Sequence, residues 1–152
     1  MKTSAHISAL LTSKPSQLWI IAPEGKVFDA IKLMTDKNVG ALLVMAGEQL
    51  VGVITERDYT RKVILQGKSS KETPIRDILS PATNAVTPHH TVEECMRLMT
   101  ENRVRHLPVV ESGKVLGIVS IGDLVNWTIH AQNATIEQME QYITGGYPQP
   151  SN

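Results

Sequence analysis

The strongest constraint on the fold of this chain is an internal repeat. Residues 19–59 align with residues 84–124 at a constant offset of 65 positions and without a gap. The identical pairs include Pro23/Pro88, Leu33/Leu98, Val44/Val109, Gly52/Gly117 and Asp58/Asp123. Most of the remaining pairs keep their apolar character, which indicates two copies of one supersecondary unit. The fold must therefore build the same unit twice.

Each copy predicts the element order β-α-β-β-α, so the expected fold class is α/β (α+β) with two such repeats. In the first copy, strands are expected over residues 18–22, 41–45 and 50–54, with helices after Pro23 and from Asp58. In the second copy, strands are expected over residues 85–87, 107–110 and 115–119, with a second helix from Asp123.

The first helix of the second copy has a clear N-terminal signal. Thr91 followed by Glu94 forms a capping box, in which each residue satisfies a backbone N–H of the other. The apolar residues of one helical face are Val92, Cys95, Met96 and Met99. Cys95 is therefore expected to be a small buried hydrophobe and not a reactive thiol.

The domain boundaries follow from the repeat and from a polar stretch between its copies. We expect repeat 1 over residues 7–64, a linker over 65–74, repeat 2 with a C-terminal helix over 75–144, and a tail over 145–152. Thr73 and Pro74 predict a short helix over 75–79. A capping box at Thr135 predicts that a separate final helix starts there and ends at Gly145.

Charge and composition exclude several function classes. Lys+Arg and Asp+Glu each number 15, so no general affinity for DNA or anionic membranes is expected. The charge is uneven, because residues 57–76 hold six cations and two acids, and residues 115–152 hold three acids and no Lys or Arg. One cysteine cannot form an internal disulfide, and no signal peptide or membrane span is evident. A cytoplasmic protein that binds neither nucleic acid nor membrane is expected.

A short motif, Gly-hydrophobic-x-Thr/Ser-x-x-Asp, occurs once in each copy. It reads Gly52-Val-Ile-Thr55-Glu-Arg-Asp58 in the first and Gly117-Ile-Val-Ser120-Ile-Gly-Asp123 in the second. With the β-α-β-β-α order and the strand Leu107-Pro-Val-Val110, it resembles the cystathionine-β-synthase (CBS) domain. Two tandem copies resemble a Bateman module, and the chain is similar to stand-alone CBS-pair proteins of bacteria and of plant organelles.

This resemblance implies a regulatory ligand-binding module and not an enzyme. The two repeats would pack about a pseudo-twofold axis and leave two clefts for an adenosine derivative, AMP foremost, or ADP, ATP, NAD or S-adenosylmethionine. It implies that Asp58 with Thr55, and Asp123 with Ser120, hold ribose and phosphate. It also implies a disc-like homodimer, an unidentified regulated protein as partner, and no required metal.

The resemblance also assigns the cleft walls to the opposite repeat. Asp58 is expected to face Val86, His106, Leu107 and Pro108. Asp123 is expected to face Ile21, Gly40, Ala41 and Leu42, with Ile118 beside it. The residue chemistry agrees, since a carboxylate can accept two hydroxyl hydrogen bonds, and an apolar slot suits a flat base.

The two copies differ where a phosphate would bind. Copy two has Arg103, Arg105 and His106 where copy one has Asn38, Gly40 and Ala41. In the motif itself, Arg57 of copy one corresponds to Gly122 of copy two. Two unequal sites are therefore expected, and the Asp58 cleft, which collects Arg57 and His106, should favour phosphate more strongly.

Simpler interpretations remain open at this stage. Asp58 and Asp123 could act only as helix caps, and Arg57, Arg61 and Lys62 could form a solvated face. His89-His90 lacks the spacing of a metal site, which favours a loop. The alternatives to a nucleotide sensor are a dimerisation or interaction module with empty clefts, and a hydrolase or transferase acting on the bound nucleotide. No nucleophile–base set or phosphate-binding loop favours the enzyme.

Overall fold

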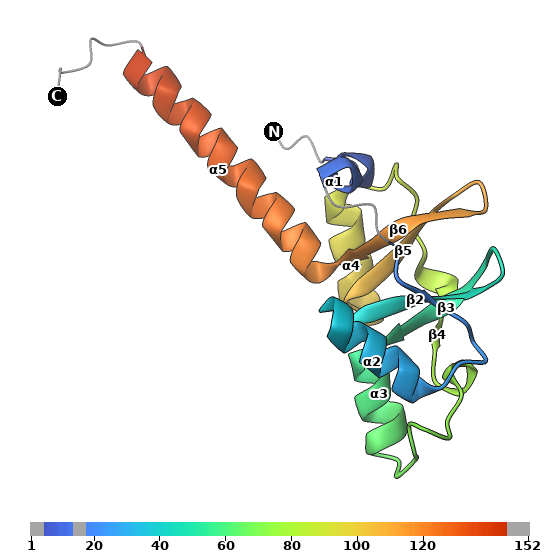
Figure 1. The fold of residues 1–152 in the computed structure, drawn as a ribbon. Helices are drawn as coiled ribbons and strands as arrows, with labels where there is room; N and C mark the ends of the chain where they lie inside the picture. The colour runs from blue at the N-terminus through green and yellow to red at the C-terminus, as the bar shows by residue number, and fades with distance from the viewer. Residues whose placement is uncertain (1–4, 14–17, 146–152) are drawn as a thin grey trace.

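The computed structural model describes residues 5–13 and 18–145 (Figure 1). The first repeat consists of β1 (Ile20–Ile21), α2 (Val27–Lys37), β2 (Ala41–Ala46), β3 (Gln49–Thr55), α3 (Glu56–Tyr59) and the π-helical turn η1 (Thr60–Ile64). The second consists of α4 (Val92–Asn102), β5 (His106–Glu111), β6 (Lys114–Ser120) and α5 (Ile121–Gly145). Helix α1 (Ile7–Ser13) precedes both, and η2 (Ile75–Asp77), β4 (Ser80–Pro81) and η3 (Ala82–Asn84) connect them.

The expected mixed α/β fold with two repeats is confirmed, and the two hairpins correspond closely. Strands β1, β2, β3 and β4 form one sheet, and β5 and β6 form another. The register pairs Ala41 with Thr55 in the first hairpin and His106 with Ser120 in the second. The strand expected over residues 85–87 is reduced to one parallel bridge between Val86 and Val109.

One expectation about where the helices begin is wrong, and another is confirmed. The second helices begin at Glu56 and Ile121, and not at Asp58 and Asp123, because Thr55 supplies the N-cap of α3. The capping box of α4 forms as expected, with the Thr91 N–H donating to Glu94 over 3.2 Å. This backbone hydrogen bond, helped by the Thr91 hydroxyl, holds the pKa of Glu94 below its ordinary value.

One other helix prediction is wrong, and another is confirmed only in part. No separate helix starts at Thr135, because α5 runs without a break from Ile121 to Gly145 and no Gly or Pro between 123 and 144 interrupts it. The helix expected over 75–79 is only a 3₁₀ turn, Ile75–Asp77. Of the expected tail over 145–152, Gly145 ends α5, and residues 146–152 lie outside the described part of the chain.

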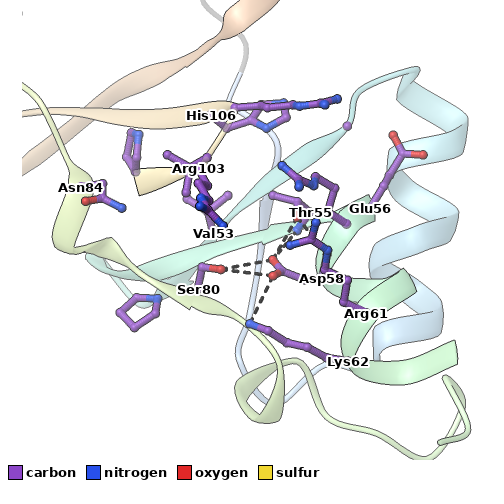
Figure 2. A pocket seen from close by; sticks show the side chains of 16 residues that line it. Val53, Thr55, Glu56, Asp58, Arg61, Lys62, Ser80, Asn84, Arg103 and His106 are labelled. Carbon is purple, nitrogen blue, oxygen red and sulfur yellow. Dashed lines mark hydrogen bonds and ion pairs between the residues drawn. The ribbon is translucent and has the colours of Figure 1, made fainter. Parts of the chain in front are cut away.

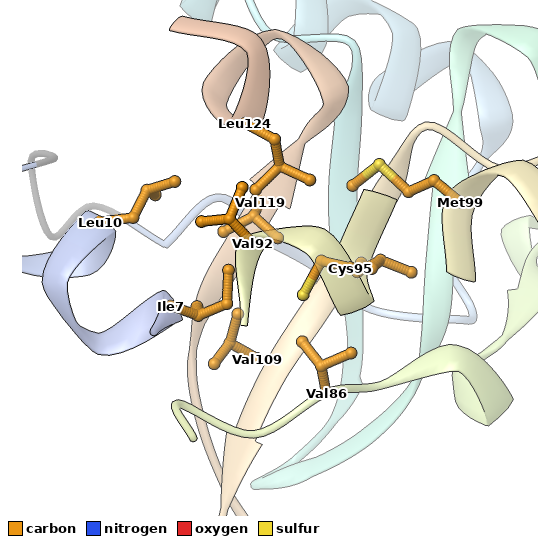
Figure 3. Close-up of a cluster of buried hydrophobic side chains, with 10 residues drawn as sticks. Ile7, Leu10, Val86, Val92, Cys95, Met99, Val109, Val119 and Leu124 are labelled. Atoms are coloured by element: carbon orange, nitrogen blue, oxygen red, sulfur yellow. The ribbon is translucent and has the colours of Figure 1, made fainter. Parts of the chain in front are cut away.

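The hydrophobic cores show that the segment leading into each repeat packs on the other repeat. Ile7 and Leu10 of α1 are buried among Val92 and Leu124 of the second repeat (Figure 3). The residues of the connecting segment buried in the core of the first repeat are Ile75 and Ile78. Each core is therefore closed by residues that precede the opposite copy in sequence.

A third cluster of buried side chains joins the two repeats. Ala41, Leu43 and Val53 of the first hairpin pack with Val115 of the second, and Ile118 lies against them. The two hairpins therefore meet through apolar faces. In the described part of the chain, no helix is long and apolar enough to cross a bilayer.

Cys95 lies in the core of the second repeat, as the helical periodicity predicts (Figure 3). Burial raises the pKa of its thiol to about 11, because an apolar environment disfavours the thiolate. The thiol therefore stays protonated near neutral pH, where the thiolate would be the reactive form.

Candidate functional site

A cavity of about 480 Å³ opens where the two repeats meet, beside the start of α3 (Figure 2). One wall comes from β3 and α3, another from the connecting residues around β4, and a third from residues 103–108 at the start of β5. The volume lies within the usual range for small-molecule sites, roughly 300–1,000 Å³.

Asp58 is the central carboxylate of this cavity, and it is only 8% exposed. It accepts hydrogen bonds from the N–H and the hydroxyl of Thr55, both over 3.0 Å. It also accepts one from the Ser80 hydroxyl over 3.2 Å. Lys62 Nζ lies 3.2 Å from Asp58 Oδ1, the oxygen that also accepts from Ser80, and donates to the Ile78 carbonyl over 3.0 Å.

These contacts explain the Thr-x-x-Asp spacing of the motif. Thr55 caps α3, and its hydroxyl accepts from the Asp58 N–H over 3.1 Å while the Asp58 carboxylate binds the Thr55 N–H. The two residues thus form a reciprocal capping box, which locks the carboxylate at the first turn of the helix. The carboxylate that completes the capping box is therefore also the carboxylate of the cavity.

The glycine of the motif has a separate steric role. Gly52 pairs with Pro81 of β4, and a Cβ at Gly52 would collide with the Ser80 carbonyl oxygen and lie 2.8 Å from Leu79 Cδ1. Only glycine lets the connecting segment lie this close to β3. That approach places the Ser80 hydroxyl against Asp58.

The charge of the cavity lining is strongly positive. Its basic side chains are Arg57, Arg61, Lys62, Arg103 and Arg105, with His106 in addition. Its acidic side chains are Glu56 and Asp58. An excess of cations in a concave, partly desolvated site attracts anionic groups more strongly than the same charges on an open surface.

The remaining lining is suited to a flat or apolar group. Val53, Pro81, Val104 and Pro108 contribute the apolar surface. Gly40 lies between Glu56 and His106, where a Cβ would come within 3.2 Å of Glu56 Oε1 and 3.6 Å of His106 Cε1. A side chain at this position would narrow the cavity.

The structure brings together part of the predicted set around Asp58. The residues predicted around Asp58 or in its motif that line the cavity are Thr55, Arg57, Asp58, Arg105, His106 and Pro108. Gly40, which was expected to face Asp123, lines the Asp58 cavity instead. Val86 and Leu107 do not line it, because both side chains are buried in the core of the second repeat. Side chains alternate along a strand, so Leu107 faces away from His106 and Pro108. The alternation in the sequence was a signal that could have shown this.

The second predicted constellation repeats the local geometry of the first. Asp123 accepts from the Ser120 N–H over 2.8 Å, and the Asp123 N–H donates to the Ser120 hydroxyl over 3.1 Å. Asp123 is not among the residues that line the Asp58 cavity. Of its expected neighbours, Ala41 and Ile118 belong to the cluster between the hairpins, Leu42 is in the first core, and Ile21 packs against that core.

Sequence reasoning missed the contribution of the connecting segment. Ser80, Pro81 and Asn84 line the cavity, although no motif marks them. Their position depends on β4 crossing beside Gly52, a long-range pairing that local patterns do not reveal. Within residues 5–13 and 18–145, no three His, Cys, Asp or Glu side chains are grouped as a metal site would require.

A family model of the CBS domain matches residues 10–64 and 75–130. The chain is 45% identical over 154 residues to the mitochondrial CBS domain-containing protein CBSX3 of Arabidopsis thaliana. The matched region covers 95% of this chain and 74% of that protein.

Solved structures show the same likeness. A candidate signal-transduction protein with CBS domains from Burkholderia ambifaria is 45% identical, with a TM-score of 0.81 over 84% of this chain and 96% of that one. A hexameric CBS-CP12 protein from bloom-forming cyanobacteria is 27% identical, with a TM-score of 0.72 over 82% of this chain and 68% of that one.

Proposed function

The chain belongs to the CBS domain family as a tandem pair, and we propose that it is a regulatory sensor that binds an adenine nucleotide in the Asp58 cavity. The observation that supports this most is the pairing, in one cavity, of a fixed carboxylate with five Lys and Arg side chains. A carboxylate suits a ribose diol, and the cations suit phosphate.

The charge of the cavity ranks the candidate ligands. AMP, ADP, ATP and NAD carry phosphates that the basic side chains would neutralise, whereas the sulfonium of S-adenosylmethionine would add a positive charge. Val53, Val104 and the prolines would contact the base. We therefore place the phosphate-bearing nucleotides before S-adenosylmethionine.

A route from binding to regulation begins at the contacts of Asp58. Ribose hydroxyls would take acceptor positions that Ser80 and Lys62 now occupy. Both contacts link α3 and η1 to the connecting segment, since Lys62 also binds the Ile78 carbonyl. Nucleotide binding would thus loosen this segment from the helix and shift the population of a surface that a partner recognises.

A thermal-shift screen with AMP, ADP, ATP, NAD and S-adenosylmethionine tests the proposal. A ligand at 100 times its Kd should stabilise the folded chain by roughly 2.7 kcal/mol, because it binds the native state only. Adenosine is the matched control for the phosphates, and GMP for the base. No stabilisation by any of the adenine compounds would contradict the sensor and favour a module that acts by protein contacts alone.

Arg57→Ala should raise the Kd of ADP roughly tenfold while leaving that of adenosine nearly unchanged. The reason is that Arg57 lines the cavity and would meet phosphate and not the base or ribose. Isothermal titration calorimetry measures both constants, with Arg76→Ala as a control, because Arg76 lies outside the cavity lining. An equal loss of adenosine and ADP binding would show that Arg57 has only a structural role. Two sites of equal affinity in the native chain would contradict the expected asymmetry.

We propose self-association, in keeping with the hexameric CBS-CP12 neighbour, and an unidentified regulated protein as the second partner. We also propose that the chain itself performs no chemistry on the nucleotide. The expected cytoplasmic location stays a prediction, and the Arabidopsis relative is a mitochondrial protein.

A further inference from the structure

Helices α2 and α4 end in the same backbone turn, but with different residues at its left-handed position. Asn38 follows α2 with a φ of 55°, and Arg103 follows α4 with a φ of 54°. In both turns the N–H of this residue donates to two carbonyls of the last helical turn. Glycine and asparagine are the residues that commonly adopt this conformation, whereas other side chains raise its energy. The turn therefore suits the residue of the first repeat and strains that of the second.

The described contacts give arginine no structural advantage at this turn. The side chain of Arg103 is exposed. Within residues 5–13 and 18–145, its guanidinium makes no hydrogen bond, ion pair or cation–π contact. Strained residues that persist in a fold are concentrated at functional sites, where the strain is offset by what the residue binds. Arg103 is thus both strained and without a protein partner.

The position of Arg103 supplies the reason for its presence. Arg103 lines the Asp58 cavity, and in Figure 2 its side chain extends into the cavity from the wall that leads into β5. Asn38 is not among the residues that line this cavity, and instead it lines a separate hollow of about 310 Å³. The arginine therefore stands at the one of the two equivalent turns that borders the Asp58 cavity.

The charge of the cavity indicates a ligand with more than one phosphate. Lys62 is already bound by Asp58 and by the Ile78 carbonyl. The remaining cavity side chains with a full charge are Glu56 and the arginines 57, 61, 103 and 105, an excess of three positive charges. A single phosphate monoester carries roughly two negative charges near neutral pH. A diphosphate or triphosphate therefore matches this excess better than AMP does.

We propose that Arg103 binds the phosphate chain of the nucleotide and sets a preference for ADP and ATP over AMP. This inference rests on the proposed function of the Asp58 cavity. Arg57 lies next to Asp58 on α3 and would meet the phosphate nearest the ribose, whereas Arg103 belongs to the opposite repeat and would meet a distal one. The planar guanidinium suits phosphate, since it donates two parallel hydrogen bonds. The phosphate chain would thus join the two repeats.

Arg103→Asn, which installs the residue of the first repeat, separates binding from stability because it should change them in opposite senses. The Tm of the nucleotide-free chain should rise by roughly 1–3 °C, because asparagine suits the left-handed turn. The Kd of ADP should rise roughly tenfold, that of AMP at most about threefold, and that of adenosine should stay within about twofold. Scanning calorimetry measures the Tm, and isothermal titration calorimetry measures the three constants.

Two further variants serve as controls. Arg103→Lys keeps the charge and the strained backbone, so its Tm should stay unchanged and its loss of ADP affinity should be smaller than that of Arg103→Asn. Asn38→Arg places an arginine in the equivalent turn, outside the Asp58 cavity. It should lower the Tm by roughly 1–3 °C and leave the Kd of ADP within about twofold.

Three results would overturn the role of Arg103. These are an unchanged ADP affinity in Arg103→Asn, an equal loss of adenosine affinity, and a fall in the Tm of this variant. Inorganic pyrophosphate separates this role from the proposed function, because it carries the phosphates without the base. If pyrophosphate stabilises the native chain but not Arg103→Asn, the role of Arg103 stands even where no adenine compound binds. If neither pyrophosphate nor any nucleotide binds the native chain, the sensor and the role of Arg103 are both refuted.

Discussion

Replacing Asp58 with alanine should raise the Kd of an adenine nucleotide at its cavity roughly 10- to 100-fold. The carboxylate is the acceptor to which ribose hydroxyls would bind, and the capping box with Thr55 holds it at the first turn of α3. Its loss removes charge-assisted hydrogen bonds and also leaves Lys62 with the Ile78 carbonyl as its remaining described partner. Calorimetric titration with ADP measures the effect.

The temperature of the titration and a control variant separate an effect on binding from an effect on folding. Loss of the Asp58 half of the capping box should lower the free energy of unfolding by about 1 kcal/mol, so titrations are made well below the unfolding transition. Asp123→Ala removes the equivalent carboxylate at the start of α5, which accepts from the Ser120 N–H, and leaves the Asp58 cavity intact, because Asp123 does not line it. Unchanged ADP affinity in Asp58→Ala, or an equal loss in Asp123→Ala, would remove Asp58 from the binding role.

Gly52→Ala should lower the free energy of unfolding by roughly 3 kcal/mol, an unusually large effect for adding one methyl group. The new Cβ would collide with the Ser80 carbonyl oxygen, which belongs to backbone and cannot rotate away. Strand β4 would have to move from β3, and Ser80 would leave Asp58. Urea denaturation measures the stability, and ADP titration measures the damage to the cavity.

The internal repeat supplies the control for this substitution. A Cβ at Gly117, the equivalent position, would lie 3.3 Å from Leu11 Cδ2, the end of a flexible side chain. Gly117→Ala should therefore change stability by less than about 1 kcal/mol, since the lower entropy of the unfolded chain offsets mild crowding. Equal costs for the two alanines would show that the close approach of β4 is not what requires glycine at 52.

The elements set by local patterns were predictable from the sequence. The hairpin strands lie within one residue of the expected ranges at each end, because apolar runs bounded by polar turns define them on their own. The capping box at Thr91 also acts over three residues and forms as expected. The Thr55–Asp58 spacing likewise fixed the central group of the candidate site.

The features that the sequence did not predict depend on contacts between distant parts of the chain. Thr135 has the sequence of a helix start, yet α5 continues through it. A capping side chain starts a helix only where the preceding helix has ended, and no Gly or Pro ends α5 before Thr135. Ser80 reaches Asp58 only because β4 crosses Gly52, and Leu107 turns away because its strand neighbours face the cavity. Tertiary pairing, and not residue type, decides these positions.

The crossed leading segments also determine how the chain can reach its native state. Ile7 and Leu10 must pack into a core whose other residues begin at Val86, and Ile75 and Ile78 must close a core already synthesised. Such pairings raise the contact order, which slows folding and joins both halves in one transition. Neither half has a complete core until the other contributes its segment. The two repeats are therefore interlocked, and we expect them to fold and unfold together.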